Sequence, residues 1–203
     1  MIWLLGTALA ADFESLVAPI DPQRAARMSA EGGSWRPGCP VPLADLRLVT
    51  VTHVGFDGAI RRGALVLHHD AVEAVLSALE AAYAVGFPIE NMAPVEAYGG
   101  SDDASMSANN TSAFNCRPIG RGGTWSQHAY GRAIDINPRV NPYVSGVRVQ
   151  PPEGEAFVDR TAPATGLIAD DSPLVQAFRV AGWTWGGSWR SSKDYQHFSA
   201  SGR

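Results

Sequence analysis

The sequence predicts a single domain of the α+β class, and three observations support that prediction. The chain has 203 residues, which at about 150 residues per domain allows one or two domains, and no segment in its middle has the composition of a linker. Helical and strand patterns both occur, but they do not alternate regularly, as they would in a doubly wound parallel sheet. The strand patterns are short, and turn-forming residues are frequent, with 21 glycines and 14 prolines.

The first third of the chain is predicted to hold a short helix and two strands. Asp21 followed by Pro22 is typical of a helix start, and this helix is expected to run to about Met28. Residues 46–54 alternate well enough to predict a strand, and the apolar run 63–67 predicts a second one.

The most regular helical pattern covers residues 71–84. Asp70 and Glu73 have the spacing of a capping box at its start. Apolar residues then recur at helical spacing, namely Val72, Val75, Leu76, Leu79 and Tyr83. The polar, glycine-rich segment 99–124 predicts a long loop, and loops of that length are usually functional or disordered.

A second helix and a set of short strands are predicted near the C-terminus. Ser172 followed by Pro173 has the pattern of a helix start, and Gly182 has that of its end. Residues 183–189 and 195–198 then predict short strands or turns.

Charge and motif content exclude several classes of function. The formal net charge is −4, and Lys193 is the only lysine among 16 basic residues. We find no basic stripe that would follow a nucleic-acid backbone. The phosphate-binding P-loop, the dinucleotide-binding glycine motif, the serine-hydrolase elbow and the HExxH zinc motif do not occur.

The two cysteines, Cys39 and Cys116, are far apart and lack the close spacing of a thiolate zinc site. They could form one disulfide or remain two free buried thiols. The N-terminus bears on this choice, because a disulfide is expected in an exported protein. Our hypothesis is that the Cys39–Cys116 disulfide exists.

Residues 1–11 have the features of a truncated signal segment. The apolar run 2–10 ends in a small-x-small pattern like a signal-peptidase site, but no positive charge precedes it. This run is too short to span a membrane. The alternative is an ordinary apolar N-terminus that packs on the core. We therefore expect a secreted or cell-envelope protein, with residues 12–203 as its single domain.

A histidine and an aspartate in the C-terminal half are the clearest candidates for a functional site. His128 and Asp135 are seven positions apart, so a continuous strand would place their side chains on opposite faces. Gly131 lies between them and allows the chain to turn, so that both side chains can approach one site. Ile134 and Ile136 share the other face of the second arm, and burying them would aim the carboxylate into a cleft.

A second pair, Asp194 and His197, lies near the C-terminus, and a turn at Asp194 that runs into a strand would bring both to one site. A catalytic zinc needs three protein ligands and an open position for water. His128, Asp135 and His197 supply two imidazoles and a carboxylate, a set that suits zinc. Asp194 would then be a carboxylate beside the bound water. Spacing alone leaves open the alternative of hydrogen-bonded structural residues.

Other histidines and acidic residues have simpler interpretations. His68 and His69 are expected at a solvated helix entrance. Asp102 and Asp103 could bind a cation but are more typical of a solvated turn.

The same residues match the signature of a known family. They form the pattern Ser126-x-His128-x-x-Gly131-x-Ala133-x-Asp135, followed downstream by Asp194-x-x-His197. This pattern resembles the signature of the zinc D-alanyl-D-alanine carboxypeptidase family, the M15 peptidases, which includes VanY-like carboxypeptidases and phage L-alanyl-D-glutamate endopeptidases. Either motif alone is weak, whereas their combination is specific. The resemblance extends more loosely from about residue 39 to residue 199.

The resemblance implies a small antiparallel sheet flanked by helices, a fold shared with the hedgehog signalling domain. It implies one zinc ion held by His128, Asp135 and His197. It also implies that Asp194 is the catalytic base, where many relatives carry Glu.

The resemblance also implies residues that contact the substrate. Ser126 matches the family serine that helps to bind substrate. The family arginine that stabilises the tetrahedral intermediate has no unambiguous match, and Arg117 is our candidate because it closes the polar loop before the zinc motif. Apart from the resemblance, Trp185 is expected to lie either in the core or in the cleft wall, and we take it as a substrate-binding residue.

The function implied is hydrolysis of peptidoglycan stem peptides, foremost as a D-Ala-D-Ala carboxypeptidase. The alternatives are an L-Ala-D-Glu endopeptidase and a cell-wall-binding module that keeps the zinc without turnover. Asp194 favours an enzyme, because a pure binding module has no need of a carboxylate beside the last ligand. We expect a monomer whose partner is the stem peptide, without nucleic acid and without a membrane span.

Overall fold

The computed structural model describes residues 12–119 and 123–202, and it confirms the α+β class. Its largest sheet has three antiparallel strands in the order β1 (Ser15–Pro19), β2 (Leu46–Val54) and β3 (Ile60–His68). β2 has the predicted bounds, β3 extends beyond the predicted strand at both ends, and β1 is a strand that the sequence analysis missed. The predicted signal segment, residues 1–11, lies outside the described residues.

Helix starts are confirmed where a single side chain caps the helix. α1 (Pro22–Ser29) begins after Asp21, whose carboxylate accepts a hydrogen bond from the Arg24 N–H at 2.8 Å. α4 (Pro173–Val180) begins after Ser172, whose hydroxyl accepts from the Val175 N–H at 3.3 Å. None of the helices in the described ranges is long and apolar enough to cross a membrane.

The predicted capping box at α2 (Val72–Ala84) is wrong, although the helix itself is confirmed. The residue before the helix is Ala71, which caps it with no side-chain bond. The Asp70 carboxylate instead binds the His68 ring at 2.6 Å and the Arg132 guanidinium at 2.6 Å. Because its carboxylate binds these two side chains, Asp70 does not cap the helix. His68 is buried there, contrary to the predicted solvated position, while His69 is exposed.

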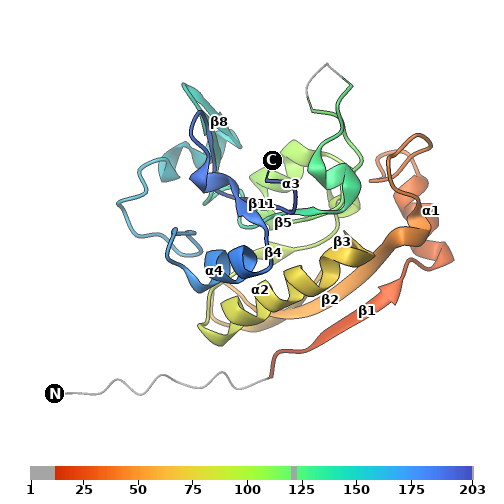
Figure 1. Ribbon diagram of the computed structural model, residues 1–203, viewed down its shortest axis with the longest axis horizontal. Helices are drawn as coiled ribbons and strands as arrows, with labels where there is room; N and C mark the ends of the chain where they lie inside the picture. Colours follow the sequence, from red (N-terminus) through yellow and green to blue (C-terminus); the bar gives the residue numbers. More distant parts are fainter. Residues whose placement is uncertain (1–11, 120–122, 203) are drawn as a thin grey trace.

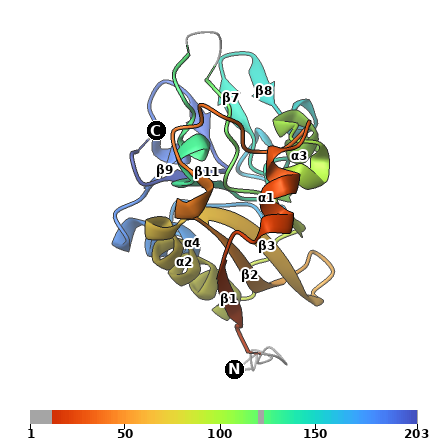
Figure 2. The same ribbon diagram turned by 90° about the vertical axis from the view of Figure 1, so that its right-hand side faces the viewer.

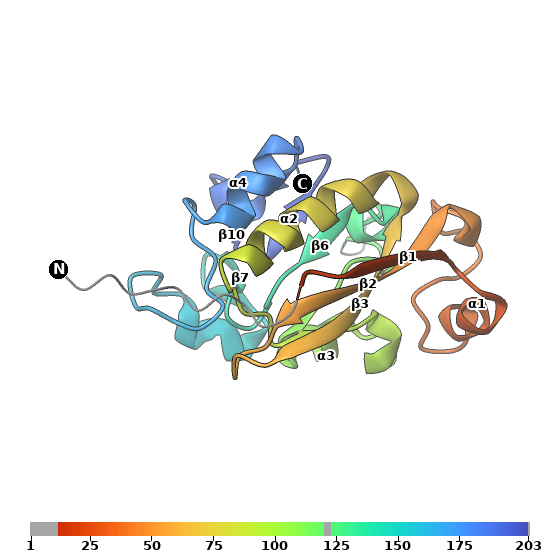
Figure 3. The same cartoon turned by 90° about the horizontal axis from the view of Figure 1, so that it is seen from below.

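The main hydrophobic core lies between the large sheet and the helices α2 and α4. α2 contacts both β2 and α4, and Figure 3 shows it between the sheet and α4. Fully buried side chains come from all of these elements, among them Val49, Leu65, Val75 and Phe178. Trp185 on β9 and Phe198 on β11 belong to the same core, which therefore supports these two C-terminal strands.

Two small antiparallel sheets hold Asp135, Asp194 and His197 of the predicted site. One has the order β6 (Ala133–Asp135), β11 (His197–Ser199) and β9 (Thr184–Trp185). The other has the order β10 (Lys193–Asp194), β7 (Tyr143–Ser145) and β8 (Arg148–Gln150). Both lie on the same side of the large sheet (Figures 1 and 2).

The segment 99–124 is not the continuous loop that its composition predicts. It contains α3 (Asp102–Ser107), capped by the Ser101 hydroxyl, and β5 (Asn110–Thr111), which pairs in parallel with β4 (Asn91–Met92). The Asn110 side chain is fully buried and bonds the backbone of Ala93 in both directions. Polar residues that are saturated with hydrogen bonds thus take core positions here.

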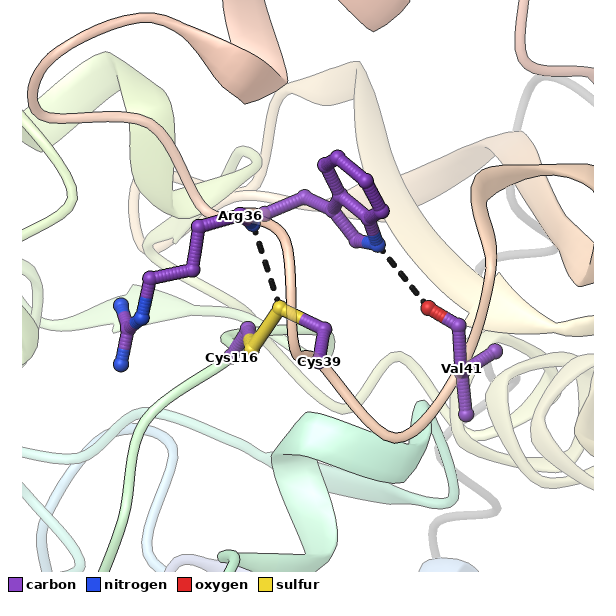
Figure 4. The surroundings of a disulfide bond; sticks show 5 residues. Arg36, Cys39, Val41 and Cys116 are labelled. Atoms are coloured by element: carbon purple, nitrogen blue, oxygen red, sulfur yellow. Dashed lines mark hydrogen bonds between the residues drawn. A yellow bond between two sulfur atoms is a disulfide. The ribbon is translucent and has the colours of Figure 1, made fainter.

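The Cys39–Cys116 disulfide is present, with the two Cα atoms 5.9 Å apart and the cysteines 77 positions apart in sequence (Figure 4). The Arg36 N–H donates to the Cys39 sulfur at 3.1 Å, and the Cys116 N–H donates to the Ser34 carbonyl at 2.8 Å. The disulfide therefore ties the chain after α1 to the segment that leads into the predicted site.

Candidate metal centre

A short helical turn positions the first histidine of the site. Ser126 precedes the turn Gln127–Tyr130, and its hydroxyl accepts a hydrogen bond from the His128 N–H at 3.3 Å. Gly131 ends the turn with φ of 65°, a left-handed conformation that favours glycine. A Cβ there would also lie 2.6 Å from the His68 nitrogen. The reversal predicted at Gly131 is thus confirmed.

Strand pairing brings the other two residues together. β6 and β11 pair antiparallel with His197 directly opposite Asp135. Ile134 and Ile136 are fully buried in the main core, as predicted, so the Asp135 side chain points to the other face. His128 reaches this face from the preceding turn.

Three donor atoms of these side chains converge. His128 Nε2 lies 3.1 Å from an Asp135 carboxylate oxygen and 3.3 Å from His197 Nδ1, and His197 Nδ1 lies 2.9 Å from the other Asp135 oxygen. All three residues are less than 7% exposed. Nitrogens bound to one zinc at about 2.0–2.1 Å in tetrahedral geometry lie about 3.3 Å apart. The separation of the two histidine nitrogens fits that value.

Hydrogen-bond chemistry also favours a cation at this point. His128 Nδ1 lies 2.6 Å from the Ala113 carbonyl oxygen, which only accepts, so Nδ1 carries the proton and Nε2 presents a lone pair. The ionised Asp135 carboxylate presents lone pairs as well. Such acceptors repel one another unless a proton or a metal ion lies between them, and the residues present fit a zinc ion.

The electrostatics of the cluster agree with this geometry. Burial by itself would raise the pKa of Asp135, but the two imidazoles beside it outweigh burial and hold the pKa well below its usual range. Burial by itself would lower the pKa of His197, but Asp135 and Asp194 raise it on balance, against the opposing charge of Arg117.

Asp194 precedes the last residue of this cluster by three positions. It ends β10, where it pairs with Tyr143, and the chain then turns into β11, as the sequence predicts. One carboxylate oxygen of Asp194 is shielded from water and has no hydrogen-bond partner among the described residues. Burial raises the pKa of Asp194 to about 6, even though His197 acts to lower it. A carboxylate with such a pKa is suited to accept a proton near neutral pH.

The structure assigns structural contacts to two of the predicted substrate-binding residues. The Ser126 hydroxyl bonds the backbone of His128, as described above. Trp185 is 5% exposed, packs on Phe198 with 6.4 Å between ring centroids, and donates its Nε1–H to the Tyr195 carbonyl at 2.8 Å. This is a core position rather than an open wall. The substrate-binding roles of Ser126 and Trp185 stay predictions.

Sequence reasoning missed three contributors to the site. The Ala113 carbonyl orients His128, and a backbone atom leaves no trace in a side-chain pattern. Gly186 packs against Asp194, because a Cβ there would lie 2.6 Å from the Asp194 carbonyl oxygen. Asp102 pairs with Arg117 at 2.7 Å, although the sequence analysis favours a solvated turn for it. An acidic residue at a helix start and a lone glycine are too common to reveal such contacts.

Comparison with known proteins gives one match. Residues 120–200, which are 81 of the 203 residues, match the family model described as D-alanyl-D-alanine carboxypeptidase, so the resemblance read from the two motifs is confirmed for this segment. No curated protein and no solved structure matches the chain. The matched segment includes His128, Asp135, Asp194 and His197.

Proposed function

The match of residues 120–200 supports assignment to the M15 peptidases, and from this premise we propose that the chain is a zinc-dependent peptidase of peptidoglycan stem peptides. The observation that carries the proposal is the convergence of His128 Nε2, His197 Nδ1 and the Asp135 carboxylate at one buried point. Asp194 beside this point favours an enzyme over a module that only binds.

The residues of the site suit peptide hydrolysis. A bound zinc would polarise the scissile carbonyl and acidify a water molecule. The Asp194 carboxylate would accept the proton of the attacking water and pass it to the leaving amine. The Arg117 guanidinium would donate hydrogen bonds to the negative oxygen that develops on the carbonyl, an effect typically worth about 3 kcal/mol. The Ser126 hydroxyl would help to orient the peptide.

Within this class we propose a D-Ala-D-Ala carboxypeptidase with the hedgehog and DD-peptidase type of fold. All three proposed ligands come from one chain, so a monomer has a complete site. The disulfide is typical of an oxidising compartment, and peptidoglycan lies outside the cytoplasmic membrane. We therefore propose a secreted or cell-envelope location.

Incubation of the zinc-loaded protein with a synthetic pentapeptide stem, followed by mass spectrometry, tests this function. A carboxypeptidase releases one alanine from the C-terminus, whereas an endopeptidase cuts the peptide internally. Chelation of the metal is expected to stop the reaction, and added zinc is expected to restore it. If zinc binds and no stem peptide is cut, the protein is a binding module and the proposed activity is wrong.

A further inference from the structure

An ion pair joins α3 to the segment that runs beside the turn of His128, and the proposed chemistry does not yet use one of its members. Arg117 Nη2 lies 2.7 Å from an Asp102 carboxylate oxygen, and the two side chains are only 33% and 27% exposed. Asp102 occupies the first turn of α3, and Ser101 provides the hydrogen-bonding cap of that helix. The Asp102 carboxylate is therefore not needed as a cap.

The backbone holds Arg117 close to His128. The Asn115 N–H donates to the His128 carbonyl at 3.2 Å, and the Ser126 N–H donates to the Arg117 carbonyl at 3.0 Å. Residues 115–117 thus run beside the turn that carries the first proposed ligand. The disulfide at Cys116 also anchors this segment, to Cys39.

The backbone alone does not determine where the guanidinium lies, because an arginine side chain has many rotamers and loses entropy when it is immobilised. The Asp102 contact takes one terminal nitrogen of the guanidinium. The Arg117 Nε is shielded from water and has no hydrogen-bond partner among the described residues. A buried N–H donor without a partner is costly to keep, so the Asp102 contact that fixes the guanidinium here has to offset that cost.

We propose that Asp102 is a positioning residue, whose carboxylate holds the Arg117 guanidinium beside the turn that carries His128, so that its remaining N–H groups can donate to an oxygen of the substrate. This inference rests on the proposed peptidase function for the identity of that oxygen. The ion pair itself does not depend on that function. Asp102 acts only through Arg117 and does not touch the reacting atoms.

A matched pair of variants tests the proposal by kinetics. Asp102→Asn keeps the shape of the side chain and removes the charge, while Asp103→Asn makes the same change at the next residue of α3, which is exposed. With the pentapeptide stem, Asp102→Asn is expected to lower kcat about 10-fold or more, with a smaller change in KM, because the guanidinium acts on the transition state. Asp103→Asn is expected to retain wild-type kinetics, and Asp102→Glu to recover part of the lost rate.

Two further measurements separate positioning from a general loss of structure. In an Arg117→Ala background, Asp102→Asn is expected to cause no additional loss, because the two residues act as one unit. By NMR, the Arg117 Nε–H signal, assigned by its absence in Arg117→Ala, is expected to exchange slowly with water in the wild type and in Asp103→Asn, and quickly in Asp102→Asn. This second readout needs no activity, so it remains decisive if the protein cuts no stem peptide.

Three results would overturn the proposal. Equal kinetic losses in Asp102→Asn and Asp103→Asn would mean that only helix stability matters. A further loss in the Arg117→Ala background would mean that Asp102 acts independently of Arg117. Unchanged protection of the Nε–H in Asp102→Asn would mean that the ion pair does not hold the guanidinium.

Discussion

Each histidine of the cluster presents a particular ring nitrogen, and a single neighbour sets that choice for His128. The Ala113 carbonyl accepts the Nδ1–H of His128 and leaves Nε2 for a metal. His197 presents Nδ1 to Asp135 because the two residues face each other across β6 and β11. The proposed ligand set therefore consists of two imidazole nitrogens of different type and one carboxylate.

We predict that His197→Ala loses the metal, because two remaining donors hold zinc much more weakly than three. Elemental analysis after dialysis is expected to find about one zinc per chain in the wild type and a small fraction of that in the variant. A zinc content equal to that of the wild type would remove His197 from the ligand set.

Asp194→Ala is predicted to keep the zinc and to lose hydrolysis, because Asp194 is the proposed base and not a ligand. The loss in kcat is expected to be at least about 100-fold, the usual contribution of a general base. Zinc content and pentapeptide cleavage are measured on the same preparation. Full activity of this variant would refute the assignment of the base.

Zinc affinity is predicted to depend on pH through His197. Burial alone would lower the pKa of this imidazole, but the Asp135 carboxylate raises it above the ordinary 6.5. Protons compete with the metal for the Nδ1 lone pair. The affinity is therefore expected to fall as the pH drops through this raised pKa, starting at a higher pH than for an ordinary histidine. Competition with a chelator over a pH series measures this, and a flat profile through neutral pH would contradict it.

At the scale of elements, the turn after β9 packs against the proposed base. A Cβ on Gly186 would lie 2.6 Å from the Asp194 carbonyl oxygen and 2.8 Å from the Asp194 Cβ. Neither of those atoms lies at the free end of a flexible side chain. The strand β10 therefore has to shift if residue 186 carries a side chain.

Gly186→Ala is accordingly predicted to lower kcat by about 10-fold or more, since a displacement of about 1 Å in a catalytic group can cost that much. The zinc content is expected to stay near that of the wild type, because the ligands lie on β6, β11 and the turn before β6. Ser191→Ala, at an exposed position between Gly186 and Asp194, serves as the control and is expected to behave as wild type. Wild-type kinetics for Gly186→Ala would show that the contact does not position Asp194.

Helices and strands could be predicted where residues close in sequence stabilise them. They could not be predicted where contacts between distant parts of the chain stabilise them. The Asp21 and Ser172 caps act within one turn of their own helices, so α1 and α4 could be identified from sequence. In contrast, β5 depends on the fully buried Asn110, whose side chain bonds the backbone of Ala93, 17 positions earlier, and the Ser105 hydroxyl on α3. A polar segment is predicted to be a loop because the sequence does not show which distant groups its side chains bond.

At the scale of the whole molecule, the disulfide links the chain after α1 to the approach of the site. Replacing Cys39 and Cys116 by serine is predicted to lower the free energy of unfolding by about 2–4 kcal/mol, because the crosslink closes a long loop in the unfolded chain. Denaturant unfolding under non-reducing conditions measures this loss. A stability equal to that of the wild type would mean that the remaining contacts of residues 30–42 suffice to hold this segment.

The sequence by itself determined the identity of the proposed ligands, because residue type and the two short motifs carry that information. Ile134 and Ile136 specify which way Asp135 points, and Gly131 specifies the reversal that precedes it. Only the tertiary structure decided which atoms meet. The facing of His197 and Asp135, the orientation of His128 by Ala113 and the pairing of Arg117 with Asp102 each join positions at least 15 residues apart. Such contacts depend on strand register and packing, which a local pattern of residues does not encode.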